Sequence, residues 1–119
     1  MNIRTIASNG IKIARVETDS VIFEDVDAAL DLMAAVRHVT HSDCMIVDAS
    51  AIHPQFFVLR NTIAGEILQK FVTYHMQLAI VGDFSQITSN SLRDFIYESN
   101  TGNQILFVAT EAEAVTRLT

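Results

Sequence analysis

The 119-residue chain has one cysteine, one proline, four glycines and no tryptophan, and its eight lysine and arginine residues are outnumbered by fourteen acidic ones. A lone cysteine excludes an internal disulfide framework. Because glycine and proline are scarce and half of the residues are apolar, a disordered, collagen-like or low-complexity chain is also excluded. The formal net charge of −6 argues against binding to nucleic acid through charge, so we expect no nucleic-acid partner.

Long hydrophobic runs are also missing from the sequence. No stretch approaches the roughly 20 apolar residues of a membrane span. Polar Thr5, Ser8 and Asn9 interrupt the apolar run that a secretory signal requires. Together with the single thiol, these absences favour a cytoplasmic location and no membrane partner. Neither a repeat nor a linker divides the sequence, so we expect a single domain over residues 1–119.

The spacing of apolar residues predicts an alternation of strands and helices. Strands are expected at 3–7, 11–16, 21–23, 44–47, 77–81 and 104–108, and helices at 27–39, 62–74, 91–101 and 111–118. Residues 53–60 are predicted to be irregular or a short helix. Asn9-Gly10 predicts a type I′ turn between the first two strands, because both residues tolerate positive φ. Ser91 fits the capped start of the third helix, and Gly102 suits a left-handed end.

This order of elements predicts the class of fold. Strands that alternate with helices need right-handed crossovers, which produce a parallel sheet. Continuous apolar strands favour a sheet that is covered on both faces. We therefore predict an α/β fold, with a single mixed, mostly parallel sheet of five or six strands. An N-terminal antiparallel hairpin forms one edge, and helices lie on the faces.

Three blocks of the sequence carry a family resemblance. They are Ala64–Phe71, Leu78–Ser85 and Ser91–Asn100. All three are similar to a bacterial family that is catalogued as domain of unknown function 4180. The resemblance covers nearly the whole chain, and it implies no particular activity.

The order of elements is also similar, more distantly, to the anti-sigma-factor antagonist (STAS) fold. In that fold, a serine or threonine at the N-terminus of a helix after a central strand is a phosphorylation switch. The resemblance implies Thr62, or more weakly Ser50, as the modified residue, and it rests on fold analogy alone. From the residues themselves, Thr62 is a candidate for a phosphate at a helix N-terminus or for an ordinary N-cap.

Carboxylates follow two of the predicted parallel strands. Asp48 and Asp83 come directly after them, at the edge where open α/β sheets bind ligands. His53 and Phe84 belong to the same edge. Alternatively, Asp83 caps the turn that leads to Ser85. Phe56, Phe57 and Phe84 either line a pocket there or close the core beneath a loop.

The helix predicted after Ser91 carries a second group of candidates. Asp94 and Glu98 lie four residues apart and therefore share one face. Together with Arg93 and Tyr97, they form either a docking surface for a basic partner protein or a solvated acidic face.

A metal site is not predicted. His38, His41, Asp43 and Cys44 are close in sequence, but they lack the spacing of a complete zinc site, which needs three or four ligands. We expect Cys44 to behave as a small apolar residue in a buried strand. No cofactor is predicted either.

Two functions remain open at this point. The leading hypothesis is a non-enzymatic, STAS-like regulatory or protein-interaction module with a protein partner. The alternative is a small-ligand-binding protein or an enzyme, in which Asp48, His53 and Asp83 supply acid–base groups. In either case an exposed edge strand would allow a symmetric homodimer, whose interface the sequence does not specify.

Overall fold

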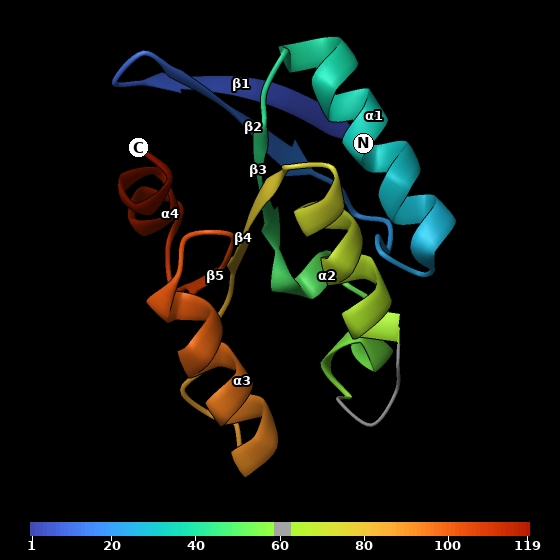
Figure 1. Cartoon of the computed structure of the whole chain (residues 1–119), viewed down its shortest axis with the longest axis vertical. Coiled ribbons are helices and arrows are strands. Elements are labelled where there is room, and N and C mark those ends of the chain that lie inside the picture. The colour runs from blue at the N-terminus through green and yellow to red at the C-terminus, as the bar shows by residue number, and fades with distance from the viewer. Residues whose placement is uncertain (59–62) are drawn as a thin grey trace.

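The computed structural model describes residues 1–58 and 63–119, which form a five-stranded sheet flanked by helices (Figure 1). The elements are β1 (Asn2–Ser8), β2 (Ile11–Glu17), α1 (Val26–Thr40), β3 (Cys44–Asp48), the short 3₁₀ turns η1 (Ala49–Ala51) and η2 (Pro54–Phe57), α2 (Ile63–Thr73), β4 (Gln77–Val81), α3 (Asn90–Thr101), β5 (Ile105–Val108) and α4 (Glu111–Leu118). In the described ranges, no helix has both the length and the apolar character needed to cross a membrane.

The sheet has the strand order β1-β2-β3-β4-β5. Strands β1 and β2 are antiparallel, and each later strand runs parallel to its neighbour. The turn between β1 and β2 has φ of 52° at Asn9 and 76° at Gly10, as a type I′ turn requires. The predicted mixed, mostly parallel sheet with an N-terminal hairpin is therefore confirmed.

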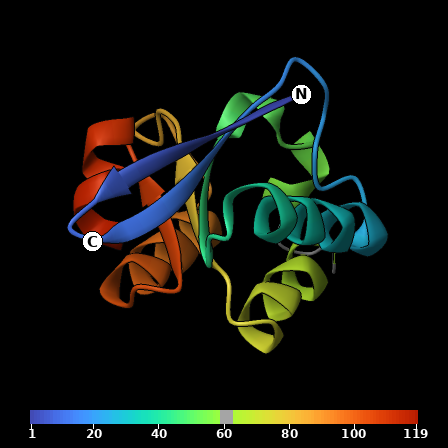
Figure 2. The same cartoon turned by 90° about the horizontal axis from the view of Figure 1, so that it is seen from above.

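The helices cover both faces of the sheet, as predicted. Because strands β2 to β5 follow one another in space and in sequence, right-handed crossovers place α1, α2 and α3 on one face. Alternate strand residues, such as Met45 and Ile80, point into that larger core. Their neighbours Ile46 and Ala79 point to the other face, against Ala114 of α4. Figure 2 shows α1 and α2 on one side of the strands and α4 on the other.

The strand predicted at 21–23 does not form. Ile22 makes a single bridge to Ile52, and Phe23 has a φ of 59°, which a strand does not allow. Both side chains are buried, and Phe23 packs against Phe56 and Phe71 with ring centroids 6.0 and 5.6 Å apart. The apolar run is explained by core packing of a loop and not by strand pairing.

The ends of α3 also differ from the prediction. Its N-cap is Ser89 and not Ser91, because the Ser89 hydroxyl accepts a hydrogen bond from the backbone N–H of Leu92 (3.2 Å). Gly102 ends the helix with a φ of −97°, so it does not adopt the predicted left-handed conformation. The first correction arises because more than one polar residue near a helix start can cap it. At the other end, Arg117 Nη2 donates to the backbone oxygens of Asn100 (2.8 Å) and Gly102 (3.1 Å), so terminal carbonyl groups are satisfied without a left-handed glycine.

Candidate functional site

The carboxyl ends of β3 and β4 lie side by side, since Asp48 pairs in register with Val81. Asp83 follows two residues later. Arg15 Nη2 donates a hydrogen bond to Asp48 Oδ1 (2.9 Å). Asp83 Oδ1 instead accepts hydrogen bonds from the backbone N–H (3.0 Å) and the hydroxyl (2.5 Å) of Ser85. Each of the two predicted carboxylates thus has its own structural partner.

The interpretation of Asp83 as the cap of its own turn is confirmed by these contacts. The hydrogen bonds from the hydroxyl and the backbone N–H of Ser85 lower the pKa of the Asp83 carboxyl. A carboxylate with a lowered pKa is a weak proton acceptor at neutral pH. Asp83 is therefore better suited to holding the loop than to general base catalysis.

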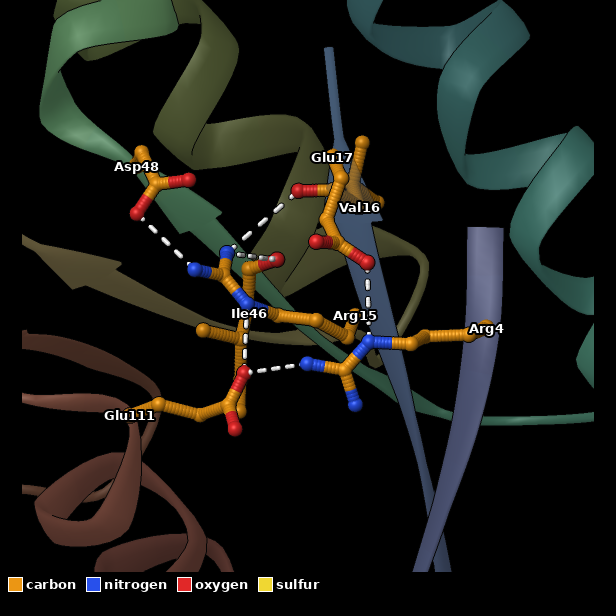
Figure 3. A network of polar contacts seen from close by, with 7 residues as sticks. All are labelled: Arg4, Arg15, Val16, Glu17, Ile46, Asp48 and Glu111. Atoms are coloured by element: carbon orange, nitrogen blue, oxygen red, sulfur yellow. Dashed lines mark hydrogen bonds and ion pairs between the residues drawn. The ribbon is translucent and has the colours of Figure 1, made fainter. Parts of the chain in front are cut away.

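Arg15 is the buried charge behind this edge, and the sequence reasoning did not single it out. It lies on β2, is 8% exposed and faces the α4 side of the sheet. Besides its bond to Asp48, it donates from Nε to Glu111 Oε1 (2.7 Å). Its Nη1 donates to the backbone oxygens of Val16 (3.3 Å) and Ile46 (3.4 Å), as Figure 3 shows. The guanidinium thus ties β2 to β3 and to the first residue of α4.

The network extends to Arg4 on β1. Arg4 Nη2 donates to the same Glu111 oxygen (2.8 Å), and its Nε donates to Glu17 (2.8 Å) (Figure 3). Burial is the largest single influence on Arg15 and lowers its pKa, but the hydrogen bonds and charges of Asp48 and Glu111 outweigh burial. The pKa of Arg15 is therefore raised, and its charge is firmly held.

One sequence signal could have pointed to this network. Arg15 stands between apolar Ala14 and Val16 in a strand, and a charge in that setting must be paired if it is buried. Its partners Asp48 and Glu111 lie 33 and 96 residues away in sequence. Sequence reasoning could therefore have predicted a buried ion pair but not its members.

Next to Asp83, the strand-end edge forms a shallow, mostly apolar hollow of about 290 Å³. It is lined by Ala49, Phe57, Asp83, Phe84, Ile87 and Leu92. Gly82 permits the close approach of η1 to the end of β4, because a Cβ on Gly82 would lie 2.7 Å from the Cβ of Ala49. Phe84 packs edge-on against Phe107, with ring centroids 5.4 Å apart. Packing between neighbouring elements thus fixes the walls of the hollow.

The aromatic residues predicted at this edge separate into two groups. Phe56 is 2% exposed and stacks against Phe23 in the core, which matches the alternative that it closes the core. Phe57 and Phe84 reach the hollow. His53 is half-buried between η1 and η2 and is not among the residues that line the hollow. The predicted edge therefore supplies an apolar wall without the predicted histidine.

Of the two residues implied as phosphorylation sites, the structure describes only Ser50. Ser50 lies in η1 and is exposed. Thr62 lies outside the described residues. Ser50 adjoins Ala49, which lines the hollow, so a phosphate on Ser50 would add negative charge beside it.

The predicted partner residues on α3 lie on its exposed side. Arg93, Asp94, Tyr97 and Glu98 are all exposed, and Tyr97 is 73% exposed. Arg93 donates from Nη2 to the backbone oxygen of Ile87 (2.5 Å), so its charge holds the loop before the helix. Asp94, Tyr97 and Glu98 remain as an outward stripe at helical spacing.

Three of the potential ligands considered from the sequence, His41, Asp43 and Cys44, line one hollow of about 340 Å³. Cys44 is buried, and burial, assisted by the charge of Asp43, raises its pKa to about 11. Asp43 pairs with Arg37, and His41 ends α1 in a left-handed conformation with φ of 54°. Among the described residues, no three histidine, cysteine or carboxylate side chains are placed to hold one metal ion.

Comparison with known proteins agrees with the family resemblance. The family model described as "Domain of unknown function (DUF4180)" matches residues 8–118. No curated protein and no solved structure gives a match, so the likeness to the STAS fold is not confirmed. Because the matched residues include strands β2 to β5 and helices α1 to α4, this chain belongs to the DUF4180 family.

Proposed function

We propose that the protein is a non-enzymatic interaction module that binds a partner protein through α3 and the adjoining hollow. The exposure of α3 carries this proposal. None of its 12 residues is fully buried, and Tyr97 is 73% exposed. The helix rests on the core through half-buried Phe95 and Ile96, while Leu92 lines the hollow. Tyrosine is one of the residue types that most often anchor a protein interface.

The charge of this surface favours a basic partner segment with an apolar side chain. Asp83, Asp94 and Glu98 are acidic, whereas the nearby Arg93 is already bonded to the loop backbone. Acidic residues around an apolar patch attract a basic partner and align it before close contact. The net charge of −6 adds to that attraction.

The enzymatic alternative has less support. Asp48 is bonded to Arg15 and Asp83 to Ser85, so each carboxylate already holds a part of the fold and does not contact the other. One observation supports the binding of a small apolar ligand, namely the hollow that is lined by Phe57 and Phe84. A small molecule that stays bound through purification and is seen by native mass spectrometry would favour this second function.

A regulatory role would act through the same surface. Phosphorylation of exposed Ser50 would place added negative charge beside Ala49 at the hollow. We expect such a phosphate to strengthen the attraction for a basic partner. Intact mass measurement on protein from its native cells, followed by phosphopeptide mapping, tests this point; unmodified Ser50 under all growth conditions contradicts it.

Site-specific photo-crosslinking tests the docking surface. A photoreactive phenylalanine derivative at position 97 should give a discrete protein adduct in cells that express the full chain at native level. The matched control is position 74, since Tyr74 is also an exposed tyrosine, at 47%, but lies beyond the end of α2. The proposal predicts the adduct at 97 and not at 74.

Charge variants complete the experiment. Asp94→Lys should abolish the adduct at position 97, whereas Asp19→Lys, the same change at another exposed position, should leave it. Binding of the identified partner to the purified chain should weaken as the salt concentration rises. Identical adducts at 97 and 74, or an adduct that survives Asp94→Lys, would overturn the proposal.

A further inference from the structure

The two edges of the sheet differ in whether their outer backbone groups have hydrogen-bond partners. At one edge, β5 is only four residues long. The side-chain amide of Asn100 donates to the backbone oxygen of Phe107 (3.0 Å), and its oxygen accepts from the backbone N–H of the same residue (2.8 Å). Asn100 therefore occupies the backbone groups that an added strand would need, which is one way that proteins block an edge.

At the other edge, β1 is seven residues long and pairs with β2 on one side. Its register runs without a bulge from Asn2 opposite Glu17 to Ser8 opposite Ile11. The strand contains neither proline nor lysine, and its one charged residue, Arg4, is paired with Glu17 and Glu111 of the same chain. In Figure 1, β1 forms the outer margin of the sheet. This margin has no counterpart of the Asn100 block in the described part of the chain.

The hairpin determines which backbone groups face the open side. Ser8 and Ile11 flank a two-residue turn, so they form a hydrogen-bonded pair. Because hydrogen-bonded pairs alternate along an antiparallel ladder, the even-numbered residues of β1 bond to β2. The N–H and C=O groups of Ile3, Thr5 and Ala7 therefore point away from the sheet.

We propose that a second copy of this chain pairs with β1 in antiparallel orientation, with Thr5 at the two-fold axis. In that register Thr5 lies opposite the partner's Thr5, and Ile3 lies opposite the partner's Ala7. Every outward N–H and C=O group of the strand then has a partner. The two sheets become one continuous sheet across the dimer.

Charge and pairing select this register over its neighbours. A two-fold axis at Arg4 would place two guanidinium groups directly opposite each other, and opposed like charges destabilise a strand pair. An axis at Ile3, Ile6 or Ala7 would leave part of the outward backbone without a partner; with the axis at Ile6, for example, Ile3 would lie opposite the partner's turn. With the axis at Thr5, Arg4 lies opposite the partner's Ile6, so no like charges are opposed.

Exposed apolar side chains near the start of β1 also favour pairing with a second copy of the chain. A hollow of about 340 Å³ is lined by Met1, which directly precedes β1, by Val21 and by residues of α1. These two side chains are 71% and 44% exposed. Because α1 packs against β1, a two-fold axis perpendicular to the sheet brings both copies of α1 to the same face. Pairing would therefore cover exposed apolar side chains of both copies, as dimer interfaces do.

The blocked edge explains why association should stop at two copies. Each chain offers one open edge, and an antiparallel pair consumes both. Since Asn100 covers Phe107, the second edge does not continue the sheet into a fibre. The interface is separate from α3, so it does not depend on the proposed docking function.

Measurement of molar mass by light scattering tests this proposal. The wild-type chain should be a dimer. Thr5→Lys and Thr5→Glu should each weaken dimerisation by about tenfold or more, because like charges then meet at the axis. A mixture of the two variants should recover the dimer, since lysine faces glutamate. Thr73→Lys, the same change at an exposed position of α2, is the control and should leave the dimer intact.

Each outcome decides the proposal. Thr5 is exposed, so circular dichroism should show that both variants keep the wild-type fold. A monomeric wild-type chain at high concentration, or a Thr5→Lys variant as dimeric as wild type, would overturn the edge pairing. If both variants are monomeric but their mixture is too, the register centred on Thr5 is wrong.

Discussion

Arg15 Nη2 lies 2.9 Å from Asp48 Oδ1, and this contact makes a carboxylate of the predicted ligand edge part of the scaffold. The guanidinium is nearly buried, whereas the Asp48 and Glu111 side chains are 38% and 39% exposed. Water can therefore solvate the two acids if the pair is broken, but it cannot solvate the arginine. This difference in exposure determines which substitutions the fold tolerates.

Removal of both acids should be more damaging than removal of Arg15. Asp48→Ala combined with Glu111→Ala should lower the free energy of unfolding by about 3–5 kcal/mol, because a buried charge loses its partners. Arg15→Met should cost less, since methionine refills much of the space with apolar atoms. Urea denaturation measures both changes.

Arg4→Ala is the control for that comparison. Arg4 bonds the same Glu111 oxygen, but its side chain is 45% exposed. Its loss should change stability by no more than about 1 kcal/mol. If Arg15→Met destabilises the protein as much as the double acid variant, the cost of leaving the buried Arg15 charge unpaired is not the main energetic term in this network.

Gly82 and Gly65 should respond in opposite ways to alanine. A Cβ at Gly82 would lie 2.7 Å from the Cβ of Ala49, so Gly82→Ala should destabilise the protein by about 1–3 kcal/mol. Gly65 lies in α2 with nothing within 4 Å of an added Cβ. Gly65→Ala should therefore stabilise the helix by about 0.5–1 kcal/mol. Thermal unfolding of both variants measures the two changes in stability. If both changes have the same sign, the close packing of Gly82 against Ala49 of η1 is contradicted.

Cys44 should make stability depend on alkaline pH. Its pKa in the folded chain is about 11, above the ordinary thiol value of 9.0, because burial disfavours the thiolate. Well below pH 9 the thiol is protonated in both the folded and the unfolded chain, so its full contribution to stability is present. As pH rises from 9 to 11, the unfolded chain loses the proton first, and stability falls.

The comparison with Cys44→Ala isolates this effect. The variant is expected to be less stable at neutral pH, because it leaves a small cavity in the core. Between pH 9 and 11, however, its free energy of unfolding should fall less steeply than that of the wild type. Parallel slopes in chemical denaturation across this pH range would show that Cys44 does not contribute.

Asn100 should protect the backbone of β5. Asn100→Ala leaves the N–H and C=O of Phe107 without their partner and should cost about 1–3 kcal/mol. The amide of Phe107 should then exchange its hydrogen faster than in the wild type. Asn103→Ala, at an exposed position nearby, is the control and should leave that exchange rate unchanged.

The sequence predicted the elements well because their signals are local. Apolar residues alternate or recur at helical spacing, and Asn9-Gly10 specifies its own turn. The contact between Asp83 and Ser85 was also within reach, since the residues are two apart. The segment at 21–23 was mistaken for a strand because burial in a loop leaves the same apolar pattern as burial in a sheet.

The sequence by itself determined the α/β class, the hairpin, the turn at Asp83 and the exposed acidic stripe of α3. Only the tertiary structure decided that Asp48 pairs with Arg15, that Asn100 covers β5 and that β1 remains open. Local patterns reflect the conformation of neighbouring residues, whereas these contacts depend on which distant strands and helices pack together. Chain topology brings such partners together, and local residue spacing does not encode it.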